Sequence, residues 1–259
     1  MVSGPEVPAN LAVAARLVAT AAAGGAKLVT LPENFYLIGS HEGDKVKARE
    51  RDGEGPIQAF LQEASRKHGV WLLGGTVPIE TKDEKRIRSA SLLYDDSGRR
   101  VARYDKMHVF RFDGGGSEKY DEARTVEPGD GPVAVDSPFG RIALSVCYDV
   151  RFPELYRRLG AFDLMLVPSA FTVPTGTAHW ETLMRARAIE NQCYVVAPAQ
   201  GGTHPGGRRT YGNSMVVDPW GEVLGVRVNG EGVVLAELDS ARIEQVRAQL
   251  PALQNRRLT

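Results

Sequence analysis

Apolar residues along the chain recur with helical spacing in several stretches, each bounded by residues that start or end helices. One stretch ends at the glycines 24–25, and another ends at Gly69. A third helix is expected to open at Pro153, a fourth over residues 177–192, and a last one over residues 240–249. The apolar positions that define the pattern are Leu11, Ala14, Ala15 and Val18, then Ile57, Phe60, Leu61 and Ala64, then Leu183, Ala186 and Ile189.

Continuous or alternating apolar runs between these helices predict strands. Two longer runs contain turn residues at their centres and predict hairpins, over residues 90–106 and 214–228. The polar, glycine-rich segment 111–131 is expected to be a loop, and so is 201–209. The single strands are expected at residues 27–35, 70–80, 133–136, 141–147, 162–170, 193–200 and 232–238.

The order of these elements predicts the fold class. Strands alternate with helices in most of the chain, and hairpins interrupt the order twice, which is typical of an α/β layered fold with a mixed sheet or two sheets. No linker, low-complexity tract or internal repeat divides the chain. We therefore expect residues 1–259 to form a single domain.

Composition limits the classes of partner. The chain is 42% hydrophobic and 25% charged, its net charge is zero and its pI is about 7.0, so nucleic-acid and membrane-surface binding are not indicated. Only Cys147 and Cys193 are present, without a CxxC pair, and a reducing, cytoplasmic location is expected. The apolar stretch 11–26 contains Arg16 and lacks a basic leader, so it is interpreted as a helix of the fold. The five histidines show no paired metal-binding spacing, and no metal or cofactor is expected.

Three chemically active residues stand where predicted strands end. Glu33, Lys106 and Cys147 follow three different apolar runs, and ligands bind at this edge of α/β sheets. Each residue alone has an ordinary structural interpretation: a surface carboxylate, a solvated amine and a small core thiol. Together they suit acyl transfer, because a thiol needs a base to become a nucleophile and an ammonium stabilises the resulting oxyanion.

Five longer stretches resemble the nitrilase superfamily of carbon–nitrogen hydrolases, in order and over nearly the whole chain. They are LPENF (31–35), RYDKMHVF (103–110), SVCYDVRFPEL (145–155), the stretch 168–200, and YGNSMVVDPWGEV (211–223). The resemblance implies a four-layer α-β-β-α sandwich that forms a homodimer or a higher homo-oligomer through helices. It also implies a C-terminal tail, about residues 249–259, that reaches across to the partner.

The same resemblance implies roles for individual residues. Glu33 is expected to act as general base, Lys106 as oxyanion donor and Cys147 as nucleophile. It implies a second glutamate after the lysine, for which Glu122 fits, and an oxyanion-hole donor at the backbone N–H of Tyr148. The strand before Cys147 would then end there in order to present the sulfur to substrate.

Residues 191–204 and 211–221 resemble the Nit branch of the superfamily. This implies a small amide substrate that carries a carboxylate, with deaminated glutathione as the first interpretation and the omega-amidase substrates 2-oxo-glutaramate and 2-oxo-succinamate as the alternative. Arg151 is a candidate to bind that carboxylate, and a structural ion pair beneath the turn is its other interpretation. A different carbon–nitrogen hydrolase, such as a carbamoylase or a nitrilase, stays open, as does an inactive homologue that serves as an interaction protein.

One departure from the family pattern concerns the start of the fold. Members of the superfamily have a strand with an A-x-x-Q pattern before the residues that match positions 1–11. The sequence therefore predicts a sheet from which this first, central strand is absent, leaving unpaired backbone groups. The sequence leaves open whether such a strand precedes Met1.

Overall fold

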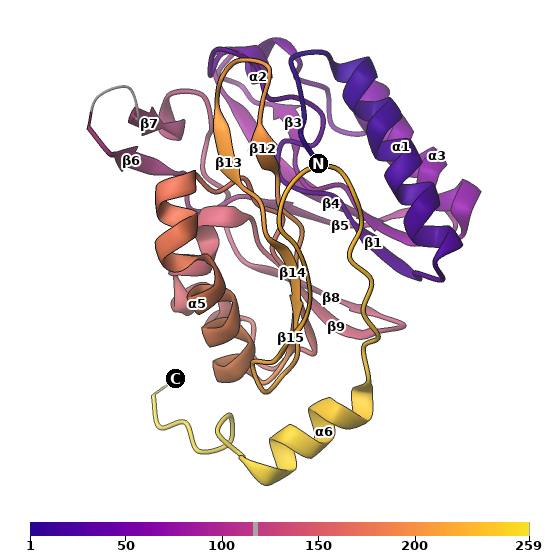
Figure 1. The fold of residues 1–259 in the computed structure, drawn as a ribbon, viewed down its shortest axis with the longest axis vertical. Helices are drawn as coiled ribbons and strands as arrows, with labels where there is room; N and C mark the ends of the chain where they lie inside the picture. The colour runs from indigo at the N-terminus through magenta and orange to yellow at the C-terminus, as the bar shows by residue number, and fades with distance from the viewer. Residues whose placement is uncertain (116–118, 259) are drawn as a thin grey trace.

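The computed structural model describes residues 1–115 and 119–258, which form two β-sheets with helices on their outer sides (Figure 1). Four of the six helices found in the described residues carry a proline in their first turn, where its missing N–H costs no hydrogen bond. The helices are α1 (Val7–Ala23), α2 (Asp44–Lys47), α3 (Pro56–His68), α4 (Pro153–Arg158), α5 (Val173–Asn191) and α6 (Ser240–Gln249), with short 3₁₀ turns η1 (Glu122–Arg124) and η2 (Cys147–Arg151).

The first sheet is built from β1 to β5, in the order β1-β2-β4-β3, with β5 on the other side of β4. Its strands are β1 (Leu28–Thr30), β2 (Trp71–Leu73), β3 (Val77–Glu80), β4 (Ile87–Tyr94) and β5 (Arg100–Asp105). Helices α1 and α3 pack side by side on its outer face. The single strand expected over residues 70–80 is divided by Gly74 and Gly75 into β2 and β3, which both pair with β4. A side chain at Gly75 would place its Cβ 2.0 Å from the carbonyl oxygen of Pro32.

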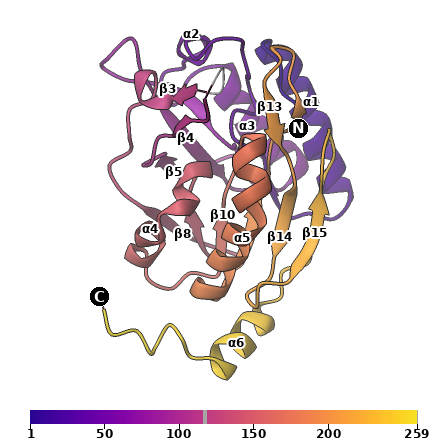
Figure 2. The ribbon, with the colours of Figure 1, turned by 60° about the vertical axis from the view of Figure 1, so that its left-hand side comes forward.

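The second sheet has the order β15-β14-β11-β10-β9-β8, and its three central strands β9, β10 and β11 are parallel. Helix α5 lies against β11 and β14 (Figure 2). The strands are β8 (Val133–Ser137), β9 (Gly140–Leu144), β10 (Leu164–Leu166), β11 (Tyr194–Ala197), β14 (Ser214–Val217) and β15 (Val223–Arg227). Buried residues of both sheets, such as Leu93 and Leu144, belong to one hydrophobic cluster. The two sheets therefore face each other across a shared core.

Two short hairpins lie outside these sheets. Strands β6 (Arg111–Asp113) and β7 (Lys119–Asp121) pair within the segment 111–131, and β12 (Gly201–Thr203) pairs with β13 (Arg209–Tyr211). The expectation that both segments are loops is wrong at these strands, because strands of three residues each, in segments rich in polar residues and glycine, are too short to show a recognisable apolar pattern. Among the described residues, no helix is long and apolar enough to cross a membrane.

The strand expected at residues 232–238 is also wrong. This segment forms no strand, and none of its backbone groups hydrogen-bonds to another backbone group of the described chain. Within residues 1–115 and 119–258, strand β1 is paired only with β2, so its other edge has no neighbouring strand there. An apolar groove of about 660 Å³ lies between β1 and the segment 232–238. It is lined by Leu28–Leu31 and Val233–Leu238, together with residues of α1. The apolar run at 232–238 fits a strand, but a strand needs a neighbour for its backbone groups.

Candidate active site

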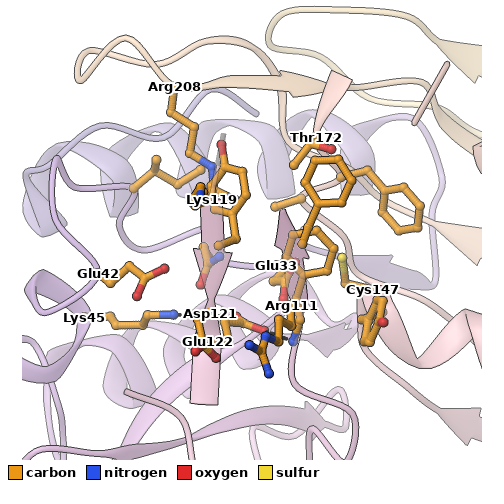
Figure 3. A pocket seen from close by; sticks show the side chains of 18 of the residues that line it. Glu33, Glu42, Lys45, Arg111, Lys119, Asp121, Glu122, Cys147, Thr172 and Arg208 are labelled. Carbon is orange, nitrogen blue, oxygen red and sulfur yellow. Dashed lines mark hydrogen bonds and ion pairs between the residues drawn. The ribbon is translucent and has the colours of Figure 1, made fainter. Parts of the chain in front are cut away.

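Three chain segments that follow strands of the two sheets meet at one cleft of about 840 Å³ (Figure 3). Glu33 comes three residues after β1, and Lys106 follows β5 directly, so the first sheet supplies a carboxylate and an amine. Cys147 comes three residues after β9 in the second sheet. The three side chains are nearly inaccessible to solvent and all line this cleft.

Lys106 lies between two carboxylates. Its ammonium nitrogen Nζ donates to Glu33 Oε1 and to Glu122 Oε2, each at 2.7 Å. Burial alone would lower the pKa of Lys106, but Glu122 and Glu33 together raise it well above the ordinary value, so the amine is charged. An ammonium has three N–H donors. Two of them bind the glutamates, and the described chain offers no hydrogen-bond partner for the third.

Cys147 sits in a tight turn at the start of η2. Its φ of 49° lies in the left-handed region, which costs a non-glycine residue about 1–3 kcal/mol and therefore needs support from its surroundings. That support includes a bond of 3.0 Å from the Cys147 N–H to the carbonyl of Pro168. The next N–H, of Tyr148, has no acceptor among the described residues, as is usual for the first turn of a helix.

The surroundings of Cys147 favour the protonated thiol over the thiolate. Burial, followed by the negative charge of Glu33, raises the pKa of the thiol well above its ordinary value, and the opposing charge of Lys106 does not cancel this. Glu33 accepts from Lys106 at Oε1, and a hydrogen bond between the Glu33 side chain and the thiol contributes to the raised pKa of Cys147. A thiol beside a carboxylate can pass its proton to that carboxylate as it attacks a substrate.

Glu122 begins the 3₁₀ turn η1 and is held by three groups. Its Oε2 accepts from Lys106 Nζ and, at 2.8 Å, from the N–H of Phe110, while Lys45 Nζ lies 3.5 Å from Oε1. Burial alone would raise the pKa of Glu122, but the charges of Lys106 and Lys45 bring it down to about 2. Lys45, in α2, was missed by sequence reasoning because it stands in a charged run that is typical of a solvated surface.

Arg151 lies at the wall of the same cleft, four residues after Cys147. Its guanidinium carbon is 5.7 Å from the ring centre of Tyr148 and 5.3 Å from that of Phe171, and Nη1 is 3.3 Å from Nδ1 of His179. Among the described residues it forms no ion pair, so the alternative of a structural ion pair beneath the turn finds no support there. The side chain is a cation beside two aromatic rings at the wall of the cleft.

A second cation, Arg208, reaches the cleft from the β12–β13 hairpin (Figure 3). Its guanidinium carbon lies 5.4 Å from the ring centre of Tyr120 in β7. The hairpin is anchored by His204, whose Nδ1 donates to the carbonyl of Ser3 while Nε2 accepts from the hydroxyl of Thr210, both at 2.8 Å. Burial lowers the pKa of His204, which favours this neutral form. Arg208 had no signal in the sequence beyond a basic pair in a polar loop.

Other basic side chains increase the positive character of the cleft opening. The residues that line it include Arg111, Lys119, Arg124 and Arg209. Its acidic residues besides the two glutamates already described are Glu42, Asp113 and Asp121. Within the described residues, no group of three or more histidine, cysteine or acidic side chains is arranged to hold a metal ion.

Comparison with known proteins shows the family. A family model described as carbon-nitrogen hydrolase matches residues 4–248. A relative from Synechocystis sp. named deaminated glutathione amidase is 42% identical over 263 aligned positions. The match covers 99% of this chain and 95% of the relative. Among solved structures, the NitFhit protein of C. elegans superposes with a TM-score of 0.91 at 38% identity, and Nit3 of Saccharomyces cerevisiae with 0.87 at 32%.

The fold is thus the α/β fold of nitrilase-type proteins. The matched region covers 99% of this chain in both structures, but only 63% of NitFhit against 93% of Nit3. The chain belongs to the carbon–nitrogen hydrolase family, and it is an enzyme of the amidase type. The resemblance stated from the sequence motifs is therefore confirmed.

Proposed function

We propose that this protein hydrolyses the amide bond of deaminated glutathione and releases 2-oxoglutarate and cysteinylglycine. The observation that carries the proposal is the buried Lys106 ammonium, bonded to Glu33 and Glu122, in the cleft that also holds Cys147. These groups suit amide hydrolysis through a thioester. The choice of substrate rests on relatives near 40% identity that carry the name deaminated glutathione amidase.

In the first half of the reaction, Glu33 takes the proton from Cys147 as Sγ attacks the amide carbonyl carbon. The carbonyl oxygen becomes an oxyanion, which accepts hydrogen bonds from Lys106 Nζ and the N–H of Tyr148. The C–N bond then breaks, and its nitrogen receives the proton held by Glu33. Cysteinylglycine leaves, and the 2-oxoglutaryl group stays on Cys147 as a thioester. The hydrogen bond between Glu33 and the Cys147 thiol and the third Lys106 donor support these assignments.

In the second half, water takes the place of the departed amine. Glu33 removes a proton from the water as the water oxygen attacks the thioester carbonyl. Lys106 Nζ and the N–H of Tyr148 bind the second oxyanion. The C–S bond breaks, 2-oxoglutarate is released and the proton returns to the thiol. Glu122 orients Lys106 in both halves, which its 2.7 Å bond to Nζ and its additional bonds to Phe110 and Lys45 support.

Deaminated glutathione carries a carboxylate on each side of its scissile amide, so its binding calls for two cations. Arg151 and Arg208 both line the cleft and are both stacked on aromatic rings, which leaves their N–H groups available to an anion. We assign carboxylate binding to this pair. Bidentate hydrogen bonds from a guanidinium are the strongest that a carboxylate can accept from a single side chain.

A product assay tests the proposal and separates it from the omega-amidase alternative. The protein is offered deaminated glutathione and 2-oxo-glutaramate, and cysteinylglycine and ammonia are measured separately. Rapid release of cysteinylglycine with slow release of ammonia is expected. Ammonia as the main product would move the assignment to an omega-amidase, and release of neither product would overturn the substrate proposal.

The assembly of the enzyme is a further part of the proposal. We propose that the two sheets and their helices form the four-layer α-β-β-α sandwich of a single domain, and that two copies associate as a homodimer. Support comes from the end of the chain, where the segment beyond α6 extends away from the body and leaves Leu250 48% and Leu258 87% exposed (Figure 1). Light scattering on the full chain should give twice the monomer mass, and a monomer would contradict the homodimer.

A further inference from the structure

A buried carboxylate close to the active site takes no part in the reaction described above. Asp149, the second residue after Cys147, is completely inaccessible to solvent, and a charge in such a position requires hydrogen-bond donors. Each of its oxygens accepts from two donors. Oδ2 accepts from Tyr104 Oη and Val146 N, both at 2.8 Å, and Oδ1 accepts from His108 N at 3.0 Å and His108 Nδ1 at 2.7 Å.

These four donors come from the two segments that carry catalytic groups. Tyr104 and His108 stand on either side of Lys106, at the end of β5 in the first sheet. Val146 directly precedes Cys147, at the end of the run that follows β9 in the second sheet. Lys106 and Cys147 therefore belong to different sheets, and Asp149 connects their segments by direct hydrogen bonds.

We propose that Asp149 is a positioning residue that fixes Cys147 relative to Lys106. The bond from Val146 N holds the turn that gives Cys147 its left-handed φ of 49°. The bonds from Tyr104 and His108 hold the chain that presents the ammonium. The inference rests on the proposed roles of Cys147 and Lys106, since without them there is no geometry to maintain.

Neighbouring contacts make the connection stiff. The ring of His108 stacks on Phe152 with ring centres 3.7 Å apart and planes at 6°, so the histidine also contacts the far end of η2. Because a carboxylate only accepts, Nδ1 of His108 carries the proton. The oxygen of Tyr104 in turn accepts from the N–H of Met107 at 3.2 Å, which ties the residue after Lys106 to the same carboxylate.

The chemistry of the site suggests an informative substitution. Asp149→Asn keeps the shape of the side chain, but an amide has only one accepting oxygen, and its NH₂ group would face two of the four donors. Whichever way the amide turns, either the Val146–Tyr104 pair or the His108 pair loses its acceptor. Asp218→Asn is the matched control, because Asp218 is also buried and accepts from Trp220 N, Glu222 N and Arg242 Nε, but lies in the β14–β15 turn.

The test measures alkylation of Cys147 by iodoacetamide, identified by peptide mass, and steady-state hydrolysis of deaminated glutathione. A 1 Å displacement of a reacting group costs up to about 10²-fold in rate, so Asp149→Asn should lower both the alkylation rate and kcat roughly 10- to 100-fold while KM stays within about threefold. Asp218→Asn should lower the melting temperature without either effect. Wild-type alkylation and kcat in Asp149→Asn would overturn the inference.

A second variant keeps the inference testable if Asp149→Asn does not fold. Tyr104→Phe removes one donor and leaves the carboxylate three, so slower alkylation at an unchanged melting temperature supports the positioning role. Unchanged alkylation in this variant would overturn it. Alkylation needs no substrate. If the proposed substrate is wrong, neither the wild type nor any variant will hydrolyse it, but their alkylation rates can still be compared.

Discussion

The active-site cleft and the apolar groove beside β1 are two hollows of similar size, about 840 and 660 Å³, with opposite character. In the cleft, buried charges find partners from distant parts of the chain, as Lys106 does with Glu33 and Glu122. In the groove, the open edge of β1 and the backbone of residues 232–238 have no backbone partner in the described chain. In the cleft, side chains pair with the buried charges. In the groove, no strand of the described chain pairs with the backbone groups on its two sides.

The difference shows that the cleft and the groove depend on different interactions. The cleft requires particular side chains at strand ends, and its arrangement is kept by bonds between the two sheets, through Asp149 and through Gln200 Nε2, which lies 3.3 Å from the carbonyl of Glu33. The groove depends on backbone pairing, to which side-chain chemistry contributes little. Changes in the cleft should therefore alter catalysis, and changes beside the groove should alter local stability.

The largest effect is expected at the nucleophile. Cys147→Ala should lower kcat by on the order of 10⁴-fold or more, because no other group can form the thioester. Cys193→Ala is the control, since Cys193 is a fully buried thiol whose pKa is raised by burial in the core. The rates are measured as cysteinylglycine release. Comparable losses in the two variants would mean that the fold, and not the nucleophile, had been damaged.

The next largest effect is expected at the oxyanion donor. Lys106→Ala should lower kcat by roughly 10²- to 10³-fold with a smaller change in KM, since the third Lys106 donor binds an oxygen that is charged only in the transition state. Lys67→Ala, an exposed lysine at the end of α3, serves as control. A change confined to KM would make Lys106 a substrate-binding residue.

A smaller effect is expected at the rim of the cleft. Arg208→Gln should raise KM for deaminated glutathione about tenfold and leave kcat nearly unchanged, which corresponds to the loss of about 1.4 kcal/mol of binding. The matched control is Arg158→Gln, because Arg158 is exposed in α4 and does not line the cleft. Equal KM values for the two variants would remove Arg208 from the carboxylate site.

Hydrogen exchange compares the two hollows without any substitution. Amides of residues 232–238 should exchange at rates close to those of an open chain, while those of β10, which is paired on both sides, should be protected by a large part of the global unfolding free energy. Peptides spanning the two segments report both rates in one experiment. Strong protection of 232–238 would show that this segment has a hydrogen-bonding partner and that the groove is filled.

The smallest effect concerns acid stability. Since the pKa of Glu122 is depressed to about 2 from an ordinary 4.5, its charged form contributes stability that is fully present above about pH 4.5 and is lost as pH falls toward 2. The unfolding free energy of Glu122→Gln should therefore depend less steeply on pH than that of the wild type between pH 4.5 and pH 2. Identical slopes from urea titrations would contradict the depressed pKa.

The site residues that could be predicted from the sequence are those that lie next to strong local patterns. Glu33, Lys106 and Cys147 could be found because each follows an apolar run, and helices α3 and α6 because their spacing and end residues agree. Glu122 was predicted as a site residue from the family resemblance alone. Lys45, Asp149 and Arg208 gave no usable signal, because their importance arises from contacts with residues far along the chain. The strand expected at 232–238 was wrong for a similar reason, since periodicity describes a segment and not its neighbours.

The proposed thioester on Cys147 can be trapped during turnover. The enzyme is mixed with deaminated glutathione, quenched in acid during turnover and digested, and the peptides that contain Cys147 and Cys193 are examined by mass spectrometry. We expect a 2-oxoglutaryl adduct on Cys147 that disappears when substrate is exhausted, and no adduct on Cys193. Turnover without any adduct, in a quench fast enough to sample a single cycle, would contradict covalent catalysis by Cys147.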